Sequence, residues 1–160
     1  MSNPPYFDCY KLKNDSPVES FKPGDFCFIF ENLMLGGGVG YSIRREDVHE
    51  IPRIKKDVNI TVKNTNDADF IVPDSREGWV ELLKRVLEAS FVTGEDFTYA
   101  THLIRSKGSA IKGFGGTASG PEDLVWGMQE INEILNKKSG QRLSPVDCLD
   151  VMNIIGRIVV

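Results

Sequence analysis

A glycine-rich loop that runs directly into a helix start is the feature that most constrains the fold of this chain. Residues 112–124 read Lys-Gly-Phe-Gly-Gly-Thr-Ala-Ser-Gly-Pro-Glu-Asp-Leu. Ser119 or Gly120 can cap the helix, Pro121 suits its first turn, and the two acidic residues that follow complement its dipole. Backbone amides at such an N-terminus can bind a phosphate. The spacing matches neither the P-loop nor the dinucleotide fingerprint, so a phosphate cradle and a flexible glycine connection both remain open.

Composition places the chain among single globular domains. Its 160 residues are 41% hydrophobic and 26% charged, which is enough for one real core. The net charge of -4 and the sequence pI near 5.2 argue against a protein that binds nucleic acid through its phosphates. No apolar run reaches the length of a membrane span and no signal leader opens the chain, so we expect a cytoplasmic protein that does not act at a membrane.

Cysteine and histidine usage argues against a metal site. Cys9, Cys27 and Cys148 are odd in number and widely spaced, which fits a reducing cytoplasm and neither a disulfide framework nor a zinc site. His49 and His102 lie far apart, without partners at ligand spacing. The sequence therefore predicts no bound metal.

The first half of the chain predicts short strands and two helices. A strand is expected over residues 7–12, and apolar residues at helical spacing predict a helix over 25–35 that ends at Gly36. Residues 36–40 then lead into an expected strand that runs through Ile43. Val58, Ile60 and Val62 alternate with polar residues, as in a half-buried strand. Asp74 with Glu77 is an expected capping pair for a helix whose apolar face is formed by Trp79, Leu82, Leu83, Val86 and Leu87.

The second half predicts two helices after the glycine loop. The first runs to about Lys137, Gly140 separates the two, and residues 144–147, Ser-Pro-Val-Asp, open the last one. Its apolar face continues to Val159 without a closing polar turn. From this we expect a piece of a larger protein, with a terminus docked on a partner chain as the alternative.

Three motifs, in order, resemble the adenosylcobalamin-dependent (class II) ribonucleotide reductases. The first is Phe-Asp-Cys-Tyr at residues 7–10 followed by Asp15-Ser16, where the family more often has Asn-Cys and then Asp-Ser. The second is Gly-Gly-Gly-Val-Gly-Tyr-Ser at 36–42. The third, and most specific, is the loop at 113–124, continued by Gly-Gln-Arg-Leu-Ser at 140–144 and Asp-Val-Met-Asn-Ile-Ile-Gly at 150–156. The likeness spans nearly the whole chain.

The resemblance implies radical reduction of the ribose 2′-carbon, with a thiyl radical generated by adenosylcobalamin. Cys9 matches the first cysteine of the pair that supplies the electrons and becomes a disulfide, whose partner can lie far along the sequence. Asp8 stands where a polar residue meets the substrate, and Gly38 matches a glycine against which the substrate lies. Without the family, Cys9 reads as an ordinary buried thiol. Cys27 and Cys148 match no catalytic position and are expected to be structural.

The same resemblance implies an effector site. Asp15 falls near the contact to the effector's base or ribose, although a turn residue before Ser16 explains it almost as well. The loop that relays effector identity to the substrate base would comprise Gly115, Gly116, Thr117, Ala118, Ser119 and Gly120. Arg105 and Lys107 can meet triphosphate oxygens, and a solvated basic turn is the alternative.

The implied fold is α/β, a partial ten-stranded reductase barrel with outer helices and an effector-binding insertion. Residues 1–43 would form the first strands and helix of the barrel, 44–111 the insertion, and 112–160 the specificity loop with the following barrel helices. The segment 72–79 resembles the monomeric, triphosphate-using branch more than the dimeric one.

The family's radical cysteine, its second redox cysteine and most of its cofactor-binding surface have no match within these residues. We therefore expect no reductase activity from the chain alone, and a complementary C-terminal reductase fragment as partner. A ribonucleotide substrate, a deoxynucleotide effector and a thioredoxin-like reductant are the other implied partners. Two other classes stay open: a stand-alone nucleotide-binding or regulatory module without redox activity, and a structural interaction domain.

Overall fold

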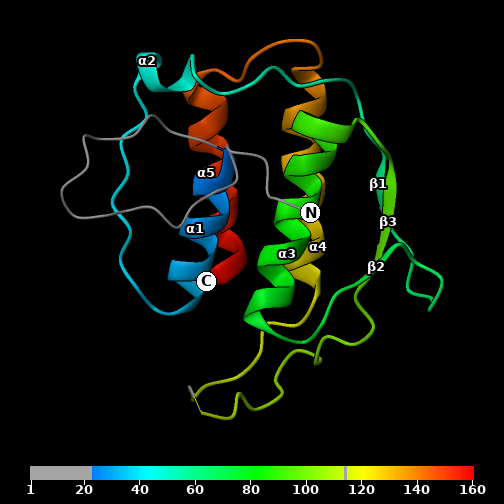
Figure 1. Cartoon of the computed structure of the whole chain (residues 1–160). Helices are drawn as coiled ribbons and strands as arrows, with labels where there is room; N and C mark the ends of the chain where they lie inside the picture. The colour runs from blue at the N-terminus through cyan, green and yellow to red at the C-terminus, as the bar shows by residue number, and fades with distance from the viewer. Residues whose placement is uncertain (1–22, 114) are drawn as a thin grey trace.

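The computed structural model describes residues 23–113 and 115–160, which form a mixed helical and stranded unit (Figure 1). The expected strand at 7–12 lies outside these residues. The elements, in chain order, are α1 (Pro23–Met34), α2 (Arg45–Val48), β1 (Ile60–Val62), β2 (Phe70–Ile71), α3 (Arg76–Glu88), the π-helical turn η2 (Ala89–Thr93), β3 (Phe97–Ala100), α4 (Glu122–Lys137) and α5 (Pro145–Val159). The long helices α1, α3, α4 and α5 pack together, and β1 lies against α4.

The three strands form a small parallel sheet in the order β1-β3-β2. The connection between β1 and β2 is short for strands that run in the same direction. Two of its polar side chains bind β3 and the residue that follows it: the Asp69 carboxylate accepts from the Thr98 amide at 2.8 Å, and Asn64 Oδ1 accepts from the Thr101 amide at 2.7 Å. These bonds hold the crossover against β3.

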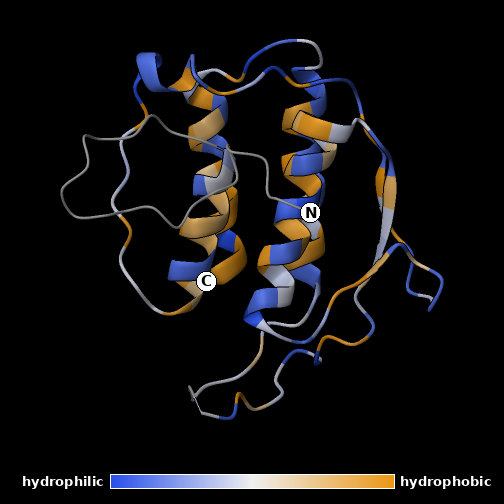
Figure 2. Cartoon of the chain, viewed as in Figure 1, coloured by the Kyte–Doolittle hydropathy of each residue, from blue (hydrophilic) through white to orange (hydrophobic). Residues whose placement is uncertain are grey.

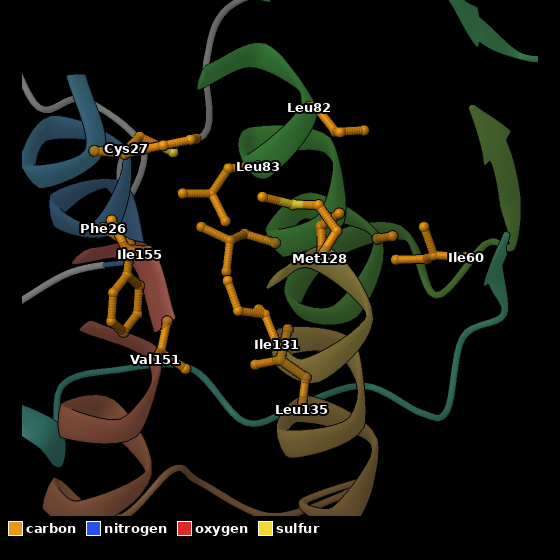
Figure 3. Close-up of a cluster of buried hydrophobic side chains, with 14 of the residues drawn as sticks. Phe26, Cys27, Ile60, Leu82, Leu83, Met128, Ile131, Leu135, Val151 and Ile155 are labelled. Atoms are coloured by element: carbon orange, nitrogen blue, oxygen red, sulfur yellow. The ribbon is translucent and has the colours of Figure 1, made fainter. Parts of the chain in front are cut away.

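The core lies between the four long helices, whose sequences alternate apolar and polar stripes (Figure 2). Figure 3 shows side chains of α1, α3, α4 and α5 meeting there, with Ile60 of β1 reaching Met128 from the sheet side. The helical side chains that are at most 1% exposed include Phe26, Phe30, Leu82, Leu83, Leu87, Met128, Ile131, Leu135, Val151 and Ile155. The fold therefore depends on helix packing, with the sheet covering one side.

The helices expected from apolar periodicity are confirmed. The helix over 25–35 is α1, and Gly36 follows it with a φ of 76°. The capping residues agree less well. α3 is capped by Ser75, whose hydroxyl accepts from the Gly78 amide at 3.0 Å, whereas Asp74 binds Arg105 instead. α4 begins after Pro121 without a side-chain cap, so the capping expected from Ser119 or Gly120 is wrong.

The strand expected through Ile43 is also wrong, since residues 37–44 are irregular and lead into α2. The Gly37 amide donates to the Asn32 carbonyl at 3.0 Å and so closes the end of α1. Three further glycines within 36–40 offer no side chains to pack on a sheet. The expected strand over 58–62 is confirmed from Ile60 onward. Val58 is buried, but its amide binds Asn136 of α4.

α5 begins where the sequence predicts, and its start is a complete capping box. The Ser144 hydroxyl accepts from the Asp147 amide at 3.2 Å, and the Asp147 carboxylate accepts from the Ser144 amide at 2.6 Å. Burial raises the pKa of Asp147, but the hydrogen bonds from Ser144 and Lys138 outweigh it and leave that pKa below its ordinary value. This helix end is therefore strongly specified by local sequence.

Ser144→Ala is expected to lower the free energy of unfolding by about 1 kcal/mol, because it leaves an amide of the first turn without its acceptor. Urea denaturation followed by circular dichroism measures the change. Ser42→Ala, at an exposed position in irregular structure, is the control and should change stability by less than about 0.5 kcal/mol. Equal effects of the two substitutions would contradict the role given to the cap.

Candidate nucleotide site

The glycine loop borders a groove at the end of the helices where α1 and α5 finish and α3 begins. The groove has a volume of about 250 Å³. In Figure 1 the segment from β3 to α4 lies beyond this end of the helices. The lining residues are Met34, Asp74, Ser75, Arg76, Trp79, Ile104, Arg105, Ile111, Ala118, Ser119, Gly120, Ile158 and Val159. Segments far apart in the sequence therefore meet at one hollow.

The loop is held by backbone hydrogen bonds, so it is more than a flexible connection. The Gly108 amide donates to the Ala118 carbonyl at 2.8 Å, and the Ala118 amide donates to the Ser109 carbonyl at 2.8 Å. The Ile111 amide donates to the Gly116 carbonyl at 3.1 Å, and Ala110 and Thr117 form an antiparallel bridge. These bonds make a short hairpin whose turn carries the central glycines.

Gly120 has two reasons to be glycine. Its φ is 83°, in the left-handed region, and a Cβ there would approach the backbone nitrogen of Lys107 to 3.1 Å and contact the Glu122 carboxylate. Gly115 and Gly116 also have positive φ values, of 79° and 87°, but open space surrounds them. At 120, both the close neighbours and the backbone conformation therefore require glycine. At 115 and 116, only the backbone conformation favours it.

Two guanidinium groups line the groove. Arg105 Nε donates to Asp74 Oδ2 at 2.8 Å, and Arg105 Nη1 donates to the Ala110 carbonyl at 3.4 Å. Arg76 Nη2 donates to Glu77 at 2.6 Å, and its buried Nε lies 3.8 Å from Glu31 Oε1 without a hydrogen bond. Arg105 keeps further N–H donors for an anion, since a guanidinium group has five.

The rest of the groove wall is apolar. Met34, Trp79, Ile104, Ile111 and Ile158 give the groove an apolar surface from four different segments. An apolar wall with a few convergent polar groups is typical of small-molecule sites. A flat ring can pack on such an apolar wall, and guanidinium groups can bind phosphate oxygens. The groove is therefore a candidate nucleotide site.

The structure brings together half of the predicted loop residues. Ala118, Ser119 and Gly120 line the groove, whereas Gly115, Gly116 and Thr117 lie exposed in or beside the hairpin turn. Arg105 lines the groove, and its contact with phosphate oxygens stays a prediction. Lys107 is exposed and is absent from the lining, although its backbone nitrogen would lie near a Cβ added at Gly120.

The other predicted site residues are separate from this groove. Asp8, Cys9 and Asp15 lie outside the described residues. Gly38 is exposed between α1 and α2, and no atom lies within 4 Å of a Cβ built there. The described part of the chain therefore does not by itself require a glycine at 38.

Several groove residues were missed from the sequence. Local sequence predicts a helix cap at Asp74, whereas its ion pair with Arg105 joins residues 31 positions apart, a separation that no local pattern reveals. Local sequence places Trp79 only on an apolar helix face. The sequence offers one indication of this pair: Asp74 is acidic, and Arg105, just before the glycine loop, is basic.

Cys27 and Cys148 are both buried, and neither forms a disulfide within the described residues. Burial, with a smaller contribution from Asp147, raises the pKa of Cys148 to about 12, so this thiol stays protonated. Within residues 23–113 and 115–160, no group of three or more His, Cys, Asp or Glu side chains is placed to hold a metal ion. No helix in that part of the chain is both long and apolar enough for a bilayer crossing.

Comparisons with known proteins agree with the motifs. A family model described as "B12-dependent ribonucleotide reductase, insertion domain" matches residues 45–135. A crystal structure of a B12-dependent (class II) ribonucleotide reductase superposes with a TM-score of 0.74 at 34% sequence identity, covering 86% of this chain and 23% of that one. The α/β character of the described residues is thus shared with a known reductase.

Curated relatives named adenosylcobalamin-dependent ribonucleoside-triphosphate reductase are similar over most of the chain. The protein of Lactobacillus delbrueckii subsp. bulgaricus is 39% identical, and that of Lactobacillus leichmannii 38% identical, each over 84% of this chain and 22% of the relative. The protein of Lacticaseibacillus paracasei is 32% identical over 98% of this chain and 25% of the relative. The chain spans about a quarter of the length of these relatives. It belongs to the B12-dependent (class II) ribonucleotide reductase family.

Proposed function

We propose that this chain supplies part of an adenosylcobalamin-dependent ribonucleoside-triphosphate reductase, which converts ribonucleotides to deoxyribonucleotides. In that enzyme the described residues bind a deoxynucleotide effector, and Cys9 is one of the two reducing cysteines. The observation that carries the proposal is the groove in which the glycine loop meets Arg105 and an apolar wall. Family membership and the names of the relatives support the reaction.

The groove suggests how the effector binds. Its phosphates interact with Arg105, which Asp74 and the Ala110 carbonyl hold at the edge of the hollow. The apolar part of the nucleotide packs against Trp79 and Ile158. Charge-assisted bonds to phosphate set the position, and the apolar wall adds contact area.

The glycine loop would then link the effector to the substrate. Ala118, Ser119 and Gly120 contact the effector, while Gly115, Gly116 and Thr117 extend away from the groove toward the substrate base. Glycine at 115 and 116 supports this division, since glycine has access to more backbone conformations than other residues. Asp15 contacts the effector's base or ribose.

The reducing chemistry is assigned to the N-terminal segment. Cys9 and a second cysteine outside these residues give two electrons and two protons, so the 2′-hydroxyl leaves as water and the two thiols become a disulfide. A thioredoxin-like reductant then restores the thiols. Asp8 and Gly38 contact the substrate. The similarity to the Lacticaseibacillus paracasei protein covers 98% of the chain, a stretch too long to leave out Cys9.

Adenosylcobalamin supplies the radical in the proposed enzyme, according to the names of the relatives. The described hollows have volumes of about 250, 300 and 370 Å³, and each is far smaller than this corrinoid. The residues that line them do not fit the cofactor, so no step assigned to this chain passes through it. The cofactor site is proposed to lie mainly in the complementary reductase fragment. The enzyme is proposed to act in the cytoplasm.

The proposed domain organisation follows the motifs. Residues 1–43 contribute the first strands and helix of a ten-stranded barrel, 44–111 the effector-binding insertion, and 112–160 the specificity loop and further barrel helices. All described elements share one hydrophobic core, which supports a close association of these parts.

Arg105→Ala is expected to weaken binding of dATP or dGTP at least about tenfold, because a charge-assisted bond to phosphate is lost. Isothermal titration calorimetry on the 160-residue chain measures the affinity. The control is Arg53→Ala, an exposed arginine whose Nη1 donates to the Gly140 carbonyl at 3.3 Å, away from the groove. Unchanged affinity in Arg105→Ala, or no binding by a chain that unfolds cooperatively, would refute the effector role.

A further inference from the structure

The carboxylate of Asp74 does not cap the helix that it precedes. Asp74 lies on the short link between β2 and α3, and Ser75 caps α3 with its own hydroxyl. Within the described residues, the Asp74 side chain makes one hydrogen bond, which its Oδ2 accepts from Arg105 Nε at 2.8 Å. An acidic residue just before a helix also complements the helix dipole, which is the ordinary explanation for it. The contact with Arg105 offers another.

Backbone hydrogen bonds fix the places of both partners. Two residues before Asp74, the Val72 amide donates to the Ala100 carbonyl at 2.9 Å. Just before Arg105, the Ile104 amide donates to the carbonyl three residues earlier at 3.0 Å. The long side chain of Arg105 is therefore the most flexible part of this arrangement, and the bond to Asp74 restricts it.

Asp74 occupies only the inner edge of the guanidinium group. It binds Nε, the nitrogen closest to the backbone, while Nη1 donates to the Ala110 carbonyl at 3.4 Å. No other hydrogen bond joins Arg105 to the described residues, so the second hydrogen of Nη1 and both hydrogens of Nη2 remain available. A phosphate can therefore bind the terminal nitrogens without displacing Asp74.

The second guanidinium group of the groove is already matched by carboxylates. Arg76 Nη2 donates to Glu77 at 2.6 Å, and Arg76 Nε lies 3.8 Å from Glu31. The Glu122 carboxylate also lies beside the glycine loop that lines the groove. Positive charge is therefore not in excess here, so recognition of a phosphate depends on N–H groups that point in the right direction. The orientation of Arg105 then becomes decisive.

We propose that Asp74 is a positioning residue for nucleotide binding: it holds Arg105 so that the terminal N–H groups of the guanidinium meet the phosphates. The proposal rests on the proposed function and adds a residue that acts through Arg105 alone. A free arginine side chain loses rotamer freedom when it binds a ligand, whereas Asp74 has already restricted that freedom in the unbound chain. The two side chains are 35% and 33% exposed, so their pairing by itself adds little stability.

The sign of one substitution distinguishes this role from its alternatives. Asp74→Asn should weaken binding of dATP by about three- to tenfold, because the guanidinium group is then ordered only when the nucleotide binds. If Asp74 instead competed with phosphate for Arg105, or acted only through its negative charge, the same change would tighten binding. Isothermal titration calorimetry on the 160-residue chain measures the affinity. Glu77→Gln removes a carboxylate beside the other guanidinium group and is the control, which should not weaken binding.

A double-mutant cycle shows whether Asp74 acts through Arg105. Asp74→Asn should cause no further weakening in an Arg105→Ala chain, because no guanidinium group is left to position. Equal weakening in both backgrounds would mean that Asp74 only supports the start of α3, and it overturns the proposal. Unchanged or tighter binding by Asp74→Asn in the parent background overturns it too.

A spectroscopic measurement follows the pair independently of the affinity. In a proton–nitrogen correlation spectrum, the Arg105 Nε–H signal is assigned by its loss in Arg105→Lys. This signal should be protected from exchange with solvent in the parent and lose that protection in Asp74→Asn. Asp74→Glu, which keeps a carboxylate, should retain part of the protection and part of the affinity. An unprotected signal in the parent contradicts the proposal.

Failure of this inference and failure of the proposed function give different results. A parent chain that binds dATP and is weakened by Arg105→Ala, but not by Asp74→Asn, would refute the positioning role alone. A folded parent chain that does not bind dATP would refute the proposed function as well.

Discussion

Replacing Cys9 by serine should abolish multiple turnover in a reductase reconstituted from this chain and the complementary polypeptide. The hydroxyl of serine cannot form the disulfide that supplies two electrons to each substrate. Deoxycytidine triphosphate formed from CTP, with adenosylcobalamin and a thioredoxin-type reductant, is the measured product. Activity should fall to the background of the complementary polypeptide alone. The 160-residue chain alone should also give no product, because it matches only about a quarter of each relative.

Cys27→Ala is the matched control, because Cys27 is a buried cysteine of the hydrophobic core. It should retain turnover, with at most a small loss of stability. Full activity in Cys9→Ser would refute the redox role and favour the stand-alone nucleotide-binding module, whose binding does not need a thiol. Effector affinity should be equal in the parent and in Cys9→Ser, which separates the redox segment from the groove.

The helices could be predicted because each buries a stripe at helical spacing. Phe26, Ile29 and Phe30 of α1 are at most 3% exposed, as their spacing indicates. The strand expected through Ile43 does not form, because the preceding glycines have no side chains to pack on a sheet or to contact a neighbouring strand. The short sheet is set by Asn64 and Asp69, whose bonds to β3 form only after the chain has folded back. Local periodicity does not contain that information.

The candidate site could be predicted only where it is continuous in sequence. The glycine loop was recognised, and three of its residues line the groove. The wall opposite the loop comes from α1, α3 and α5, and helix packing alone brings Met34, Trp79 and Ile158 together. The ion pair between Asp74 and Arg105 depends on the same packing.

Gly127→Ala is expected to destabilise the chain by about 1–3 kcal/mol, although alanine usually favours a helix interior. Gly127 is buried in α4, and a Cβ there would overlap Cδ1 and Cγ1 of Ile158, which is 1% exposed on α5. The neighbouring residues also pair, with the Arg157 guanidinium 3.9 Å from the centre of the Trp126 ring. A side chain at 127 therefore requires the buried Ile158 side chain to move. Urea denaturation of the variant measures the loss.

Gly156→Ala is the matched control on the partner helix, because a Cβ there meets no atom within 4 Å. It should stabilise the chain by about 0.5–1 kcal/mol, the ordinary gain when alanine replaces a helical glycine. The same substitution on adjacent helices thus has opposite signs. Ile158→Val removes Cδ1, so it should cost less in the Gly127→Ala background than in the parent, and the double-mutant cycle measures this coupling. A stabilising Gly127→Ala, or no coupling to Ile158, would show that α4 and α5 do not make this close contact. The groove should respond as well, because Ile158 lines it, so the Gly127→Ala chain should bind dATP more weakly even where it remains folded.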